Sequence, residues 1–400
     1  MLASAFLRSP LAPSSNRRCL SHLSNPPPLA PAQPPAHDPV RPPYRVLFFG
    51  ADSFSCEVFK RVHQARQGLV SDLVVVTPPD HWVGRKNKER HTPALRRLAE
   101  ELEVPSIALP KTLLKGWQPP ELFLPSPPSS ISVAPSPQNL LITASFGHLI
   151  PTSLLSLFLP LNTLNVHPSL LPKYRGAAPI QWSVMNGAAD EEDAMGVTVQ
   201  ELSRRKFDQG RILGQNTVSV PPDADFRTLE PLLARAGGDL LVSVLRDLDA
   251  KQAAAIPQDS TFATHARKLT KTDSRAMWAE MSAENLLRLQ RGAGHQYPLW
   301  TTRTRLSSAT AIATAPPSEP TELQLRLSAH LTPLTSRLTY ALPGTAVLDP
   351  QTKLLIIKCR DGKVGVVVDE VKPQDRGWVK ARDWWNGLEK QAKAEGALLE

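Results

Sequence analysis

Residues 45–77 read RVLFFGADSFSCEVFKRVHQARQGLVSDLVVVT, and this stretch decides the fold class. It begins and ends with short apolar runs, 45–50 and 72–77, and such runs are typical of buried strands. Between them Val58, Phe59 and Val62 recur at the spacing of one helix face. A strand, a helix and a second buried strand in this order predict two parallel strands connected by the helix.

The same alternation continues to residue 248. We expect strands at 140–144, 163–166, 197–202 and 212–220, and helices after Thr92-Pro93, from Pro179 to Gly187, and over 226–248. This pattern predicts an α/β fold with a Rossmann-like, mostly parallel sheet that helices cover on both faces. The turn after the first strand lacks the GxGxxG pattern, so a dinucleotide cofactor is not expected.

Beyond about residue 262 the pattern changes. Residues 270–290 have helical character, and short strands are expected at 344–348, 353–359 and 363–368. Asp-Pro and Asp-Gly turns separate these strands. Successive short strands with tight turns predict a smaller β-barrel domain at the C-terminal end.

Proline marks the boundaries between these parts. Of the 40 prolines, eleven lie in residues 1–43 and nine in residues 105–138. Such segments are typical of linkers and surface loops, so we expect insertions at 115–138 and 306–322. The predicted organisation is a leader and linker (1–43), an N-terminal domain (44–249), a linker (250–262) and a C-terminal domain (263–400).

The first 37 residues carry Arg8, Arg17 and Arg18 but no acidic residue, and they are rich in serine. This composition is typical of a mitochondrial transit peptide, so we expect a protein of the mitochondrial matrix. A disordered tail without a targeting role is the alternative.

Charge and cysteine content limit the function classes. The net charge is +9, of which +3 comes from the first 43 residues, so composition alone favours an RNA partner only weakly. Three cysteines far apart cannot form a disulfide framework or a cysteine-rich zinc site, and we expect no metal. No apolar run is long enough to span a bilayer, so no membrane association is expected. A monomer is the default expectation.

Residues 164–180, LNVHPSLLPKYRGAAPI, carry the candidate chemistry. Asn165 and His167 are two apart at the end of an expected strand, so both side chains can point into a crevice at the sheet's carboxyl edge. The asparagine amide can donate to a developing oxyanion, and histidine can hold a proton near neutral pH. Asp208 supplies a carboxylate that can orient the imidazole. The residues alone leave open a purely structural role for all three.

This segment resembles the hallmark of the 10-formyltetrahydrofolate-dependent formyltransferases. The SLLP run, followed by a basic residue, an aromatic residue and RGAAPI, is most similar to the members that act on methionyl-tRNA. The similarity extends over most of the chain, including ASFGHLIP at 144–151 and, more weakly, the C-terminal domain. The resemblance implies an OB-like C-terminal domain that binds tRNA, and 10-formyltetrahydrofolate as the formyl donor.

The resemblance also implies roles for individual residues. Asn165, His167 and Asp208 fall on the family's catalytic positions. The positions implied to contact the folate are Ser169, Leu170, Leu171, Pro172, Phe146 and Gly147. The chain departs from the family in having Asp208-Gln209-Gly210 where Asp-Thr-Gly is common, and Phe146 where tyrosine is common.

Residues 79–97 contain six Lys or Arg and two acids, together with Trp82. Cationic side chains beside an aromatic ring suit the end of an RNA, although an ordinary solvated loop has the same composition. The resemblance implies that this loop contacts the tRNA acceptor arm. The residues expected to contact initiator methionyl-tRNA are Arg85, Lys86, Lys88, Arg90 and Arg175.

Three functions remain open at this point. The first is formyl transfer to methionyl-tRNA for the initiation of mitochondrial translation. The second is formyl transfer to a small amine, such as a ribonucleotide or an amino sugar. The third is an inactive RNA-binding relative that kept the fold.

Overall fold

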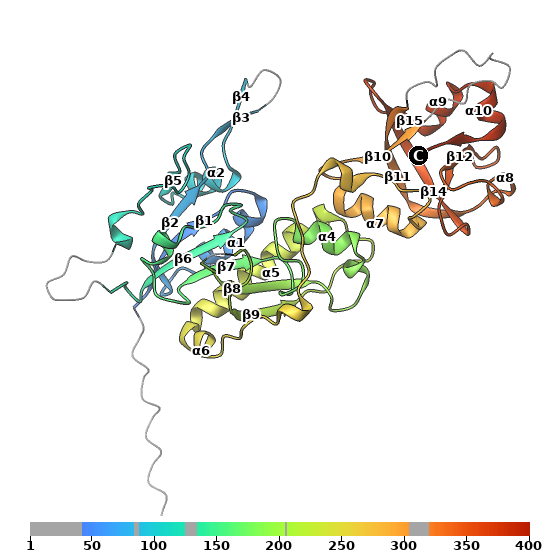
Figure 1. Ribbon diagram of the computed structural model, residues 1–400. Helices are drawn as coiled ribbons and strands as arrows, with labels where there is room; N and C mark the ends of the chain where they lie inside the picture. Colours follow the sequence, from blue (N-terminus) through green and yellow to red (C-terminus); the bar gives the residue numbers. More distant parts are fainter. Residues whose placement is uncertain (1–41, 84–87, 125–133, 205, 304–319) are drawn as a thin grey trace, which may run out of the picture. The chain divides into compact units, whose positions relative to one another are not determined.

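The computed structural model describes residues 42–83, 88–124, 134–204, 206–303 and 320–400 (Figure 1). Two large sheets and a two-stranded hairpin form within these ranges. Almost all of the predicted leader and linker lies outside the described residues, as do the centre of the insertion at 115–138 and most of the insertion at 306–322.

The first sheet is mostly parallel, as the sequence predicts. Parallel pairing runs from β5 to β7, whereas β8 is antiparallel to β7 and β9 is antiparallel to β8. Its strands, in their order across the sheet, are β5 (Ser106–Ala108), β2 (Val70–Thr77), β1 (Tyr44–Phe49), β6 (Asn139–Ala144), β7 (Thr163–His167), β8 (Gly196–Glu201) and β9 (Ile212–Thr217).

Both faces of this sheet are covered, and the central strand β1 shows how. Val46 and Phe48 are buried in one core with α1 and α5, whereas Leu47 and Phe49 are buried in a second core with residues of α3. Side chains alternate between the two faces of a strand, so a continuous apolar run serves both cores. The helices of this part are α1 (Ser53–Gln64), α2 (Ala94–Glu101), η1 (Glu121–Phe123), α3 (Thr152–Leu155), α4 (Pro179–Met185), η2 (Ala188–Asp190), α5 (Phe226–Arg246) and α6 (Leu248–Ala253).

The second sheet is an antiparallel half-barrel, which agrees with the predicted OB-like domain. Its path is β10 (Leu299–Arg303), β11 (Thr321–Pro333), β14 (Val364–Pro373), β13 (Leu355–Lys358), β12 (Thr345–Leu348) and β16 (Ala397–Leu398), with β15 (Val379–Lys380) beside β14. The helical elements from residue 260 onward are η3 (Ser260–Phe262), η4 (Lys271–Ser274), α7 (Ala283–Ala293), α8 (Ser336–Thr339), α9 (Ala381–Asn386) and α10 (Lys390–Glu395).

The single helix expected over 270–290 is wrong. Only η4 and α7 are helical, and the chain between them is not. The Ala276 N–H donates to the Trp300 carbonyl oxygen over 2.8 Å, and the buried Trp278 indole donates to Thr301 over 2.9 Å. These contacts with strand β10 replace helical hydrogen bonds, and Ser282 then caps α7.

Two loop expectations also need correction. Part of the basic segment is a hairpin of β3 (His81–Val83) and β4 (Glu89–His91). Phe123 lies within the expected surface insertion but is fully buried in a core cluster with residues of α3. A large apolar side chain in a proline-rich segment can therefore belong to the core, because burial of its ring outweighs the local composition.

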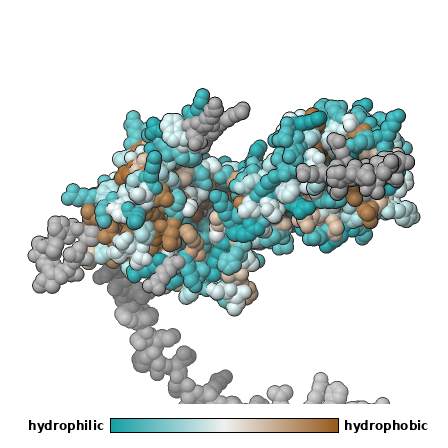
Figure 2. All heavy atoms as spheres, turned by 45° about the horizontal axis from the view of Figure 1, so that its top comes forward, coloured by the Kyte–Doolittle hydropathy of each residue, from teal (hydrophilic) through white to brown (hydrophobic). Residues whose placement is uncertain are grey.

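The face of the molecule in Figure 2 is largely hydrophilic, with apolar residues scattered over it. Among the described residues, none of the helices combines the length and the apolar character needed to cross a bilayer.

Candidate active site

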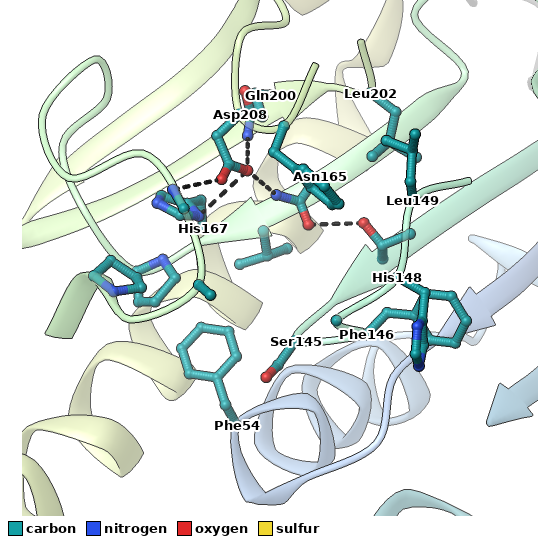
Figure 3. A pocket seen from close by; sticks show the side chains of 18 of the residues that line it. Phe54, Ser145, Phe146, His148, Leu149, Asn165, His167, Gln200, Leu202 and Asp208 are labelled. Carbon is teal, nitrogen blue, oxygen red and sulfur yellow. Dashed lines mark hydrogen bonds and ion pairs between the residues drawn. The ribbon is translucent and has the colours of Figure 1, made fainter. Parts of the chain in front are cut away.

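The carboxyl ends of β1, β6 and β7 open onto a pocket of about 430 Å³ (Figure 3). Asn165 and His167, both on β7, line it, and so does Asp208 from the connection between β8 and β9. The structure therefore brings together the three residues that the sequence singled out. Pro168 follows His167 directly and disfavours helical backbone there, so the strand ends in an open turn.

The side-chain amide of Asn165 is held in one orientation. The Thr143 hydroxyl donates to Asn165 Oδ1 over 2.7 Å, and Asn165 Nδ2 lies 3.4 Å from Asp208 Oδ1 (Figure 3). Because the oxygen is occupied by Thr143 on the neighbouring strand, the two N–H groups face the side of the pocket where Asp208 lies. Asn165 is thus available as a hydrogen-bond donor.

His167 is buried, with 4% of its surface exposed, and both ring nitrogens have neighbours. Nε2 lies 3.0 Å from the Tyr174 carbonyl oxygen, and Nδ1 lies 3.5 Å from Asp208 Oδ1. A carbonyl oxygen can only accept, so Nε2 carries a hydrogen. A hydrogen on Nδ1 would point at the carboxylate, so the doubly protonated ring satisfies both neighbours.

Asp208 is the common partner of the site. Gln200 Nε2 donates to Asp208 Oδ1 over 3.0 Å, and the Gly176 N–H donates to Oδ2 over 2.9 Å. Gln200 pairs across the strands with Asn165, which explains why both amides reach the same carboxylate. The backbone of Asp208 has a φ of +55°, a left-handed conformation that is disfavoured outside glycine.

The SLLP segment lies behind His167. Ser169, Leu170, Leu171 and Pro172 do not line the pocket. The Ser169 hydroxyl donates to the Lys173 carbonyl oxygen, and the hydroxyl of Thr198 on β8 donates to the Ser169 carbonyl oxygen over 2.6 Å. These hydrogen bonds hold the segment in the connection that follows β7. Its contact with the folate stays a prediction.

Phe146 and Gly147, also predicted on the folate side, do line the pocket. The Phe146 ring packs edge-on against Phe49 with centroids 5.1 Å apart, which leaves it 5% exposed. Gly147 has a φ of +77°, a conformation that suits glycine in this turn. Together they give one wall of the pocket an apolar and rigid surface.

Two carboxyl groups that the sequence analysis missed also line the pocket. Asp52 accepts from the Ser55 N–H at the start of α1 and from the Ser145 hydroxyl. The Ser53 hydroxyl donates to Glu230 over 2.7 Å. Burial raises the pKa of both carboxyls, although part of Asp52 reaches solvent, and the charge of Asp52 raises the pKa of Glu230 further. The position of Asp52 just beyond a buried strand could have identified it.

The residues predicted to contact tRNA lie in different settings. Arg85 and Lys86 fall outside the described residues, and Lys88 is exposed. Arg90 pairs with Asp80, with Nε and Oδ2 2.6 Å apart. Arg175 is only 6% exposed and donates to Gln258, so its predicted contact with tRNA would have to be made from a buried position. A tRNA contact stays a prediction for all five.

Sequence reasoning also missed the supports of the catalytic cluster. Thr143, Gln200 and Gln258 contact the candidate catalytic residues, but each is an ordinary polar residue in its local sequence. Only Thr143 carried a usable signal, because it lies near the carboxyl end of a predicted strand. Among the described residues, no group of three or more His, Cys, Asp or Glu side chains could hold a metal ion.

A sequence model described as Formyl transferase matches residues 44–245, and one described as Formyl transferase, C-terminal domain, matches residues 268–389. The chain belongs to the formyl transferase family. It is therefore a formyltransferase, and the pocket with Asn165, His167 and Asp208 is its candidate active site.

Relatives of this formyltransferase occur in animals and bacteria. The mitochondrial methionyl-tRNA formyltransferase of Homo sapiens is 30% identical over 87% of this chain and 78% of its own length. The methionyl-tRNA formyltransferase of Synechococcus elongatus is 32% identical over 87% of this chain and 98% of its own. A crystal structure of HypX from Aquifex aeolicus in complex with tetrahydrofolic acid has 15% identity and a TM-score of 0.47, covering 85% of this chain and 46% of that one.

Gly210 tests how tightly the turn that carries Asp208 is packed. A Cβ atom at this position would lie 1.8 Å from the Glu201 carbonyl oxygen, a backbone atom that cannot move aside alone. We expect Gly210→Ala in this formyltransferase to lower the free energy of unfolding by about 1–3 kcal/mol, measured by urea denaturation.

Gly377→Ala is the control, because a Cβ there would meet no atom within 4 Å. It should change the stability by less than about 0.5 kcal/mol. Equal stabilities for the two variants would show that the turn is loosely held.

Proposed function

We propose that this formyltransferase moves the formyl group of 10-formyltetrahydrofolate to the α-amine of methionyl-tRNA, which gives N-formylmethionyl-tRNA for the start of mitochondrial translation. The observation that carries the proposal is the cluster of Asn165, His167 and Asp208 at the pocket, in a chain whose residues 175–180 read RGAAPI. The names of the relatives and the additional C-terminal half-barrel support a tRNA acceptor over a small amine.

The pocket suits the pterin ring of a folate. Its volume of about 430 Å³ lies in the range of small-molecule sites, and its apolar walls include Phe146, Leu149 and Leu202. The donor supplies an activated formyl carbon, and the residues of this chain then bind, orient and stabilise charge.

The three catalytic candidates divide the work of the transfer. As the amine attacks, negative charge develops on the formyl oxygen, and Asn165 Nδ2 donates to it. Nε2–H of His167 is bound by the Tyr174 carbonyl oxygen, so the ring donates through Nδ1–H, whose contact with Asp208 is the longer of the two at 3.5 Å. Asp208 orients the His167 ring through Nδ1, and its carboxylate can accept the proton that the amine loses. The bond between the formyl carbon and N10 of the folate then breaks, its electron pair goes to N10, and N10 takes up the proton that the amine lost. No covalent intermediate with the enzyme is required.

The mitochondrial part of the proposal rests on the composition of residues 1–37, which are basic and contain no acidic residue. The animal relatives with mitochondrial names agree with it. The bacterial relatives are just as similar, so identity by itself does not decide the compartment.

The decisive assay supplies the full chain with labelled 10-formyltetrahydrofolate and methionyl-tRNA, together with free methionine and an amino sugar nucleotide as competing acceptors. We expect label on the methionyl-tRNA, because the additional domain and the basic hairpin offer contacts that only a large RNA acceptor uses. Label on a small amine instead would keep the chemistry and overturn the acceptor. Bound tRNA without label on any acceptor would indicate an inactive relative.

Replacing a donor tests the roles in the transfer. We expect Asn165→Ala and His167→Ala each to lower kcat by at least about a hundredfold, because each removes a donor to the developing charge. Binding of tRNA, measured by filter retention, should be unchanged.

Asn216→Ala is the matched control, because Asn216 is exposed on β9 and does not line the pocket. It should keep full activity. Near-normal turnover in either pocket variant would contradict the assigned roles.

The basic hairpin can be tested through salt dependence. We expect Arg85→Ala combined with Lys86→Ala to raise KM for tRNA and to flatten its dependence on salt, because fewer phosphates would be neutralised. Arg235→Ala combined with Arg246→Ala, two exposed positions on α5, removes the same charge and should leave the slope unchanged. Equal slopes for the two double variants would remove the hairpin from the proposed interface.

A further inference from the structure

Gln258 lies in the connection between α6 and η3, outside both ranges that match the formyl transferase models. Although it is remote in sequence from the catalytic residues, its side chain makes hydrogen bonds to the segments that form the site. Every polar atom of this side chain has a partner there.

The nitrogen of the Gln258 amide holds the turn that carries Asp208. Nε2 lies 3.0 Å from the Asp208 carbonyl oxygen and 2.8 Å from the Gly210 carbonyl oxygen. It also lies 3.0 Å from Oε1 of Gln200, the residue whose Nε2 donates to the Asp208 carboxylate. The two N–H groups of the amide thus face three acceptors. Two are the carbonyl oxygens of Asp208 and Gly210, and the third is the side-chain oxygen of Gln200.

The oxygen of the same amide fixes its orientation. Gln258 Oε1 accepts from Arg175 Nε over 2.9 Å and from Arg175 Nη2 over 2.7 Å. An arginine can only donate, so the oxygen has to face Arg175 and the N–H groups have to face the turn. Gln258 therefore connects the RGAAPI segment with the backbone of the turn that carries Asp208.

The backbone that follows Gln258 is attached to the same segment. The Tyr174 N–H donates to the Thr264 hydroxyl over 2.8 Å, and the Arg175 N–H donates to the Thr264 carbonyl oxygen over 2.9 Å. The Ala266 N–H in turn donates to the Arg175 carbonyl oxygen over 2.7 Å. These bonds hold the chain that follows Gln258 in one register against the RGAAPI segment.

We propose that Gln258 is a positioning residue for formyl transfer: it holds the left-handed turn at Asp208 so that the carboxylate faces His167, Asn165 and the Gly176 N–H. The φ of +55° at Asp208 is disfavoured by itself, and Gln258 binds the carbonyl oxygens of Asp208 and Gly210 in that turn. The inference rests on the proposed function, in which Asp208 acts together with His167.

Kinetics of Gln258→Ala in the full chain give the first test. We expect kcat for formyl transfer to methionyl-tRNA to fall by about ten- to a hundredfold, because small displacements of a catalytic group are costly. KM for the folate should stay within about threefold of the wild-type value, since Gln258 does not line the pocket. An unchanged kcat would overturn the proposal.

Gln258→Glu separates the two ends of the amide. Glutamate keeps an oxygen for Arg175 but places a second oxygen against the carbonyl oxygens of Asp208 and Gly210. We expect at least as large a loss of kcat as for Gln258→Ala. Restored turnover would mean that only the contact with Arg175 matters, and would overturn the role assigned to the nitrogen.

Hydrogen exchange gives a readout that needs no substrate. The Gly176 N–H donates to Asp208 Oδ2 over 2.9 Å, so its protection reports on the position of the carboxylate. In Gln258→Ala we expect this amide to exchange about tenfold faster or more. Unchanged exchange at Gly176 in a folded variant would overturn the proposal even if activity fell, and Gln258→Glu serves in its place if the alanine variant does not fold.

Gln252→Ala is the matched control. Gln252, on α6, donates to the Leu161 carbonyl oxygen and to Asn162 Oδ1, and it contacts none of the catalytic candidates. It should keep both the wild-type kcat and the protection of Gly176. If the wild-type chain itself formylates no tRNA, the proposed function fails, whereas the exchange experiment still decides whether Gln258 positions Asp208.

Discussion

A carboxylate that is almost removed from solvent needs hydrogen-bond donors, and the candidate active site is organised around the donors that contact Asp208. Its side chain is only 10% exposed, and it accepts from Asn165, Gln200 and the Gly176 N–H. These donors come from β7, from β8 and from the turn after β7. Leaving such a group without partners would cost several kcal/mol, so the three segments have to converge.

The backbone of the turn at Asp208 is closely packed as well. Its φ is left-handed, and Gly210 has no room for a side chain against Glu201. Ser145, which follows β6 and also lines the pocket, has a left-handed φ of +47° as well, and its hydroxyl donates to Asp52. Two walls of the pocket are therefore formed by backbone conformations that persist only because neighbouring groups hold them.

The reversal of strand direction at β8 determines which side chains meet beside Asn165. The antiparallel β8 lies beside β7 in a register that places Gln200 opposite Asn165. The connection from β8 to β9 then returns to the pocket with Asp208. The dinucleotide pattern is missing from the turn after β1, and in its place Asp52 caps α1 and binds the loop after β6.

Local sequence indicated six strands of the first sheet, the position of Asn165 and His167 at a strand end, and the open turn that Pro168 imposes, because each depends on side-chain periodicity or on backbone preferences of neighbouring residues. It did not indicate the three-residue edge strand β5, which is too short to show a periodicity. It failed where distant contacts prevailed: the extended stretch with Trp278, the buried Phe123 and the buried setting of Arg175. Only the tertiary structure showed that Thr143, Gln200 and Gln258 contact the candidate catalytic residues. Their partners are set by sheet order, strand register and the path of a connecting segment, and none of these is encoded in the few residues around each polar side chain.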